Sequence, residues 1–238
     1  GQGLLMDLGN LGTTMNVQRN PVAMYATLGE AGAERTGGAR ATNLLRLREI
    51  VQDTRDYMAN RSAFDANNRR SYSLSRLDLE AMIPVVRGEL PLAVTVNRAS
   101  DILNALRLGR ELNLKLILLG AAEGWMVAGD IARANVPVVI NPLTNLPSFD
   151  ALGITFENAA RLNTAGVTIV LASVDSHNTR DLKQIAGNAV SSGLPHDVAL
   201  RAVTLTPARL WGIADRYGSI EVGKDADIVV WSGDPFEL

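Results

Sequence analysis

Residues 204–236 decide the fold of this chain, and they read TLTPARLWGIADRYGSIEVGKDADIVVWSGDPF. Pro207 suits the first turn of a helix, because its missing N–H would be unpaired there in any case. Gly212 suits the end of that helix. Residues 228–231 are all β-branched or aromatic, as a buried strand requires. The stretch therefore predicts a helix, a polar turn and a short buried strand close to the end of the sequence.

The order of these parts closely resembles the closing segment of the amidohydrolase superfamily, the metal-dependent hydrolases built on a TIM barrel. Members of that family end with a Thr-x-x-Pro-Ala helix, then Gly-x-Ile/Leu-x-x-Gly-Lys-x-Ala-Asp, then an apolar strand. Here Thr204 and Gly218 open the two motifs, and both motifs follow the family spacing. The resemblance implies that the strand at 228–231 belongs to a small β-sandwich domain beside the barrel.

Composition limits the classes of protein to consider. Hydrophobic residues make up 47% and charged residues 20%, which is typical of a soluble globular protein. A net charge of -2 predicts no general affinity for nucleic acid or anionic membranes. The absence of cysteine excludes disulfides and thiolate chemistry, and leaves both cytoplasm and periplasm open. No apolar run approaches the roughly 20 residues that span a bilayer. The sequence also lacks a phosphate-binding P-loop and a nucleophile elbow.

Four apolar runs without clean alternation predict strands buried on both faces of a parallel sheet. These runs are Leu92–Val96, Leu114–Leu119, Val136–Ile140 and Val167–Ala172. Helical patterns separate or follow them, beginning at Ser100 and then covering Glu123–Ala134, Phe156–Asn163, Arg180–Ser191, His196–Val203 and Pro207–Trp211. Alternating strand and helix at this spacing indicates βαβ units and an α/β fold.

The first third of the chain has a different pattern. Gly1–Thr14 is rich in Gly, Asn and Thr and is expected to be a loop, and Gly1 is not a natural start, so a native N-terminus is expected upstream. Ala41–Asn60 predicts a long amphipathic helix. Ala63–Ser73 is polar and basic, and we interpret it as a solvated connection rather than a binding patch. Ser75–Asp78 resembles a capping box that opens a helix running to Val86.

Four strands do not close a barrel, which needs about eight. The resemblance assigns the four runs to barrel strands five to eight. It makes residues 1–215 a partial barrel of the metallo-dependent hydrolase type and residues 216–238 the closing segment of the small β-domain. The first barrel strand of the family carries a His-x-His metal pair, but this chain has only His177 and His196. An open barrel edge predicts either a missing N-terminal half or a partner copy in a homo-oligomer.

In a TIM barrel the reacting groups follow the carboxyl ends of the strands. Relatives in the group with imidazolonepropionase-like and prolidase-like members often have His-Ala-x-Arg-Ala-x-Asp-Ile after strand five. This chain has TVNRASDI from Thr95, so Thr95 replaces a metal-binding histidine. Many relatives have His-Gly after strand six, where this chain has GAAE from Gly120. The candidate substrate-binding residues are Thr95, Asn97, Glu123, Asn141 and Asn145. Glu123 has a second interpretation, as a dipole partner at a helix start.

Asp175 is the candidate catalytic residue, because it matches the family aspartate after strand eight. In the family that residue binds metal and takes a proton from the attacking water, whose pKa the metal lowers. The alternative is that Asp175 caps the next helix. His177 is a second candidate metal ligand, or else a loop histidine bonded to backbone. We interpret His196, which follows Pro195 at a helix start, as structural.

Two hypotheses for function follow. In the first, the protein is a hydrolase that cleaves a non-peptide or dipeptide C–N bond of a small molecule with metal-activated water. The cofactor would be a divalent metal, with zinc the first choice. In the second, it is a degenerate, metal-free barrel with a binding or accessory role and no cofactor in this chain. Asp175 and the closing motif favour the first hypothesis, and the two replaced histidines favour the second.

Overall fold

The computed structural model describes residues 1–7, 16–144, 146–173 and 176–237. The chain divides into two compact units. The N-terminal unit consists of Gly1–Thr95 with Asn104–Leu116, and the C-terminal unit consists of Val96–Leu103 with Ile117–Leu238. Among the described helices, none is long and apolar enough to cross a membrane.

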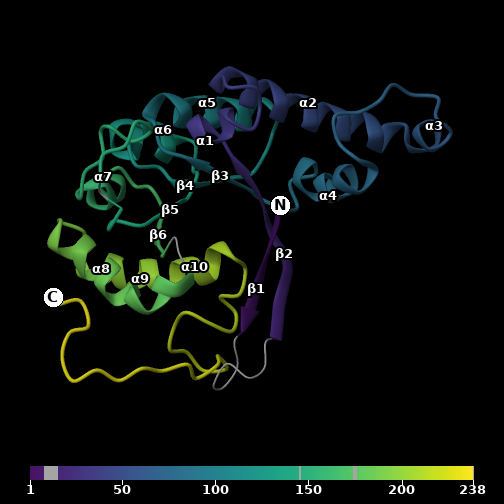
Figure 1. The fold of residues 1–238 in the computed structure, drawn as a ribbon. Coiled ribbons are helices and arrows are strands. Elements are labelled where there is room, and N and C mark those ends of the chain that lie inside the picture. The colour runs from purple at the N-terminus through teal and green to yellow at the C-terminus, as the bar shows by residue number, and fades with distance from the viewer. Residues whose placement is uncertain (8–15, 145, 174–175, 238) are drawn as a thin grey trace. The chain divides into compact units, whose positions relative to one another are not determined.

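A β-hairpin opens the N-terminal unit (Figure 1, purple). Strand β1 (Gln2–Asp7) pairs antiparallel with β2 (Asn16–Thr27). The end of β2 then pairs in parallel with β3 (Leu92–Val96), with Met24 opposite Leu92. The expected loop at Gly1–Thr14 is therefore wrong for residues 2–7, since the apolar run at 4–6 gains a partner strand. The position of β3 is confirmed.

Helices α1 to α4 complete most of this unit. They are α1 (Gly29–Ala33), α2 (Arg40–Ala59), α3 (Arg61–Asp65) and α4 (Arg76–Val86). The long helix expected at 41–60 is α2, and it packs against α4 around the fully buried Tyr57 and Leu79. Ser75 is confirmed as the N-cap of α4, because its hydroxyl accepts a hydrogen bond from the Asp78 N–H at 3.3 Å. The Asp78 carboxylate accepts a hydrogen bond from the Ser75 hydroxyl at 2.6 Å.

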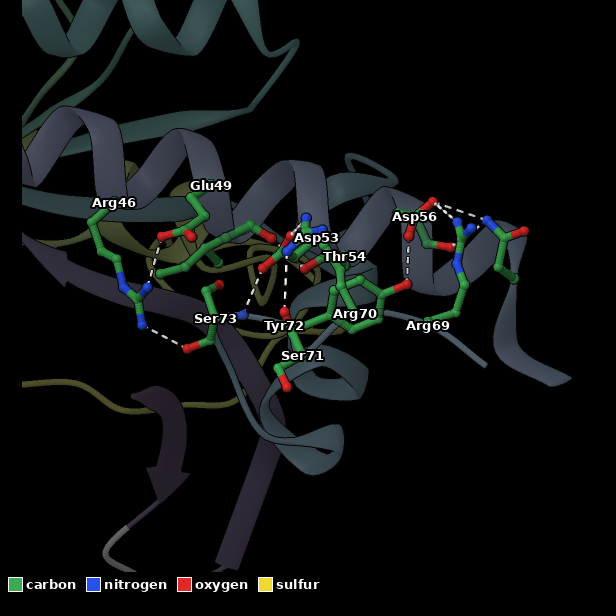
Figure 2. A network of polar contacts seen from close by, with 12 residues as sticks. Arg46, Glu49, Asp53, Thr54, Asp56, Arg69, Arg70, Ser71, Tyr72 and Ser73 are labelled. Atoms are coloured by element: carbon green, nitrogen blue, oxygen red, sulfur yellow. Dashed lines mark hydrogen bonds and ion pairs between the residues drawn. The ribbon is translucent and has the colours of Figure 1, made fainter. Parts of the chain in front are cut away.

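Polar contacts tie the connection between α3 and α4 to α2 (Figure 2). The fully buried carboxylate of Asp53 accepts a hydrogen bond from the Ser73 N–H at 2.6 Å and pairs with Arg70. One turn further along α2, Asp56 accepts a hydrogen bond from the Tyr72 hydroxyl at 2.5 Å and pairs with Arg69. The basic run at 63–73 is a connection, as expected, but its arginines neutralise helix carboxylates instead of being simply solvated.

Three parallel strands form the sheet of the C-terminal unit. They are β4 (Leu116–Gly120), β5 (Val138–Ile140) and β6 (Ile169–Leu171). Leu118 lies opposite Val138 and Val139 lies opposite Val170, so both pairings are parallel as expected. The helices of this unit are the start of α5 (Ala99–Glu111), the 3₁₀ helix η2 (Gly124–Val127), α6 (Ala128–Arg133), α7 (Asn158–Thr164), the 3₁₀ helix η3 (Ser176–Asp181), α8 (Leu182–Ser191), α9 (His196–Val203) and α10 (Leu205–Leu210). Strand and helix alternate, which confirms the α/β class.

The tail after α10 corrects one expectation (Figure 1, yellow). The segment Ile228–Trp231 is not a strand, and Val230 is 90% exposed. A strand needs a neighbour to receive its backbone hydrogen bonds, and within the described residues none lies beside this segment. The small β-sandwich is therefore not seen, and the boundary at 215/216 stays a prediction. The tail is instead held at its end, where Phe236 is buried.

Candidate active site

The carboxyl ends of the strands in the C-terminal unit bring two chain segments together. After β4, the N–H of Ala121 donates to the carbonyl of Val96 at 2.8 Å, and the N–H of Glu123 donates to the carbonyl of Asn97 at 2.9 Å. Gly120 has φ 85° and Ala121 has φ 45°, so the chain turns sharply through two left-handed residues. A Cβ at Gly120 would lie 2.6 Å from the Asn97 side-chain oxygen. A side chain at position 120 would therefore collide with Asn97 unless Asn97 moved.

Glu123 is a buried carboxylate with both oxygens engaged. Its Oε2 accepts a hydrogen bond from the N–H of Ala99 at 2.9 Å, and its Oε1 accepts one from the N–H of Gly153 at 3.0 Å. Glu123 therefore ties the start of α5 to the loop between β5 and α7. The second interpretation of Glu123, as a dipole partner at the start of a helix, agrees with the structure. The helix whose start it contacts is α5 and not the one that follows Glu123 in the sequence. Its contact with substrate stays a prediction.

Asn158 and Trp125 fix the same region from the other side. The buried Asn158 amide accepts from the Trp125 N–H at 3.0 Å and donates to the Ala121 carbonyl at 3.0 Å. The indole Nε1 of Trp125 donates to the carbonyl of Gly153 at 2.8 Å. Neither residue is evident from the sequence, because their partners are backbone groups that any residue type provides. Together they hold residues 121–125 against the β5–α7 loop.

The remaining predicted residues occupy different places. Asn97 Nδ2 lies 3.5 Å from Asp150 Oδ2, which makes a weak contact with the β5–α7 loop. Asn141 follows β5, and its Oδ1 accepts a hydrogen bond from the Leu143 N–H at 3.0 Å to form a turn. Thr95 lies in the N-terminal unit, where its carbonyl accepts from the Leu28 N–H at 2.9 Å. Of the predicted substrate-binding residues, Asn97 and Glu123 therefore lie where the segment after β3 meets the segment after β4.

Asp175 and Asn145 lie outside the described residues. The backbone of His177 belongs to η3, but its side chain also lies outside what the structure describes. The structural role of His196 is confirmed, because its Nε2 lies 2.8 Å from Asp234 Oδ2 and its ring lies 5.0 Å from that of Phe236. The Phe236 N–H and His196 lower the pKa of Asp234.

The structure describes only part of the candidate metal site, because the side chains of Asp175 and His177 lie outside it. Among the side chains that the structure describes, which do not include those of residues 174–178, no three or more from His, Cys, Asp or Glu gather as a group that could hold a metal ion. The family resemblance places Thr95 and Gly120 where many members carry histidine.

Comparison with known proteins gives the same family for sequence and structure. The model of the amidohydrolase family matches residues 102–238. The crystal structure of an amidohydrolase from Thermotoga maritima matches with a TM-score of 0.82 and 29% identity, over 93% of this chain and 60% of that chain.

Two curated relatives match over shorter stretches. Amidohydrolase tasK of Hapsidospora irregularis is 54% identical over 43 residues, which is 18% of this chain and 4% of that protein. The 5-methylthioadenosine/S-adenosylhomocysteine deaminase of Desulforudis audaxviator is 32% identical over 112 residues, which is 42% of this chain and 25% of that protein. The chain thus spans a quarter or less of these curated relatives in the matched regions.

Proposed function

Because the chain belongs to the amidohydrolase family, we propose that the whole protein is a hydrolase that cleaves a C–N bond of a small molecule with an activated water. The observation that carries this proposal is the family match over 102–238, which includes the strand ends β4 to β6 and the closing motif. Likeness to an amidohydrolase structure at a TM-score of 0.82 supports it.

The proposed roles follow the positions of the residues at the strand ends. Asp175 follows β6 and is proposed to take the proton of the attacking water, since a carboxylate is a general base of suitable strength. Asn97, Asn141 and Asn145 are proposed to contact the substrate through their amides, and Thr95 through its hydroxyl. Glu123 is proposed to reach the substrate while it holds the two segments in place, because a carboxylate has about four acceptor sites.

A divalent metal, with zinc as the first choice, is part of the proposal for the whole protein, with Asp175 and His177 as its ligands in this chain. Thr95 and Gly120 offer no imidazole, so fewer ligands are present than in relatives that keep both histidines. We expect elemental analysis of the purified full-length protein to find at most one metal ion per chain, lost on dialysis against a chelator. A stoichiometric pair of tightly held zinc ions would show that the metal site is not degraded.

The alternative function is a metal-free barrel that binds a small molecule without hydrolysing it. The observation that favours it is the replacement of both histidines together with the lack of a three-ligand group in the described part of the chain. The release of free amine distinguishes a hydrolase from a protein that only binds the molecule. The full-length protein, incubated with panels of dipeptides, N-acyl amino acids and lactams, is expected to release amine from at least one class. Binding without amine release from any of them would favour the alternative.

A further inference from the structure

The loop between β5 and α7 exposes an unusual number of large apolar side chains. It runs from the carboxyl end of β5 to the start of α7 and has no helix or strand among its described residues. The exposed side chains are Leu143, Leu146, Phe149, Leu152 and Phe156, of which Leu146 is 86% and Phe149 70% exposed. A group of exposed apolar residues of this size commonly marks a surface that contacts another molecule.

Arg98 adds a cation to this apolar loop. Its guanidinium carbon lies 5.3 Å from the centre of the Phe149 ring, a cation–π distance. Arg98 is half-buried, and within the described residues no carboxylate lies at ion-pair distance from it. Other arginines of the C-terminal unit have a described carboxylate partner, as Arg201 has in Asp197 at 2.7 Å. Among the described residues, the positive charge of Arg98 therefore lies against the ring of Phe149.

The buried Glu123 fixes the relative position of Arg98 and Phe149. One carboxylate oxygen binds the N–H of Ala99, the residue after Arg98. The other oxygen binds the N–H of Gly153, four residues beyond Phe149. A Cβ at Gly153 would lie 2.2 Å from the Met126 methyl group, so the loop also packs closely at this point. Such support restrains the pair before any ligand arrives, which lowers the entropy lost on binding.

We infer that Arg98 binds a free carboxylate of the substrate and that the apolar loop contacts a hydrophobic group on the same molecule. A guanidinium presents a planar fork of N–H donors that matches a carboxylate, and stacking on Phe149 leaves those donors at its edge. The substrate class is then an amide with a carboxylate and an apolar side chain, such as an N-acyl amino acid or a dipeptide. This inference rests on the proposed C–N hydrolysis at the same strand ends.

The test uses matched pairs of probes on the full-length protein. The pairs are N-benzoylglycine, N-acetyl-leucine and glycyl-leucine, each as the free acid and as its carboxamide. We expect Arg98→Met to lower kcat/KM for the best acid about 50-fold and to change its carboxamide less than about threefold, because only the acid loses a charge-assisted contact. Arg98→Lys is expected to restore part of the loss. Arg133→Met, which removes an arginine paired on α6 with Asp130, is the matched control and is expected to change neither.

Calorimetric binding of the same probes separates this inference from the hydrolase proposal. Tighter binding of an acid than of its carboxamide, abolished by Arg98→Met, supports Arg98 even if no amine is released, and in that case the hydrolase proposal alone fails. Equal affinity of the wild type for acids and carboxamides, no binding of either, or an equal loss for both in Arg98→Met would overturn the role of Arg98.

Discussion

Asp175→Asn is expected to lower kcat for C–N hydrolysis about 10³-fold, in the range that loss of a general base gives. Asparagine keeps the shape of the side chain but is neither an anion nor a base. Asp175 comes four residues after the end of β6 in the sequence, and the family resemblance matches it to the aspartate that follows barrel strand eight. The measurement is the initial rate of amine release, with the circular dichroism spectrum as a check on folding.

Asp181→Asn is the matched control for this change. Asp181 ends η3, six residues after Asp175, and lies 3.7 Å from Arg180 in an exposed ion pair. Its replacement is expected to leave the rate within about twofold, because exposed ion pairs contribute little. A folded Asp175→Asn protein with the wild-type rate would contradict the assigned role.

Asp53→Ala is expected to destabilise the protein by about 2–3 kcal/mol, the largest loss expected from a single side chain of the network in Figure 2. The change leaves the Ser73 N–H without its acceptor and removes the partner of Arg70. Urea unfolding at pH 7 measures the loss. Glu49→Ala is the control, because it removes a carboxylate of the same helix whose ion pair with Arg46 is exposed to solvent. This change is expected to leave the free energy of unfolding the same within experimental error.

The contribution of Asp53 also has a defined pH dependence. Burial alone would raise its pKa, but the hydrogen bond from the Ser73 N–H and the hydrogen bond and charge of Arg70 outweigh burial and lower the pKa below its usual value. A carboxyl with a lowered pKa in the folded state stabilises the protein above its unfolded pKa, about 3.9. That stabilisation is lost as pH falls through the lower, folded value. The stability difference between wild type and Asp53→Ala is thus expected to shrink below about pH 4. A difference that stays constant down to pH 3 would show that Asp53 is not held by these contacts.

Strands within the parallel sheet were predictable because their residues are apolar in an unbroken run. Their ends were less predictable, since β5 begins at Val138 and not at Val136. Pro137 has no N–H to donate, although its carbonyl accepts a hydrogen bond from Leu118 at 2.9 Å. The hairpin strands β1 and β2 were not predicted at all, because the apolar run of β1 is only three residues long and β2 is polar at its start and contains Pro21. Each strand also depends on the other for pairing.

The apolar segment Ile228–Trp231 was predicted to be a strand, but it is not one. Its composition is that of a strand, but composition does not supply the neighbour that a strand requires. At the candidate site, the sequence identified Glu123 and Asn97 through their positions after strands. It did not identify what Glu123 binds, because Ala99 and Gly153 contribute only backbone N–H groups from 24 and 30 residues away. Such partners carry no residue-type signal.

Hydrolysis in ¹⁸O-labelled water tests the central claim most directly. A hydrolase of the amidohydrolase family that cleaves a C–N bond with water must place one labelled oxygen on the carbon that loses its nitrogen. We expect mass spectrometry to find one ¹⁸O atom in the acyl or carbonyl product for each amine released by the full-length protein. Asp175→Asn is expected to form this labelled product about 10³-fold more slowly. Products without label, or bound amides recovered intact after long incubation with wild-type protein, would contradict the assignment as a hydrolase.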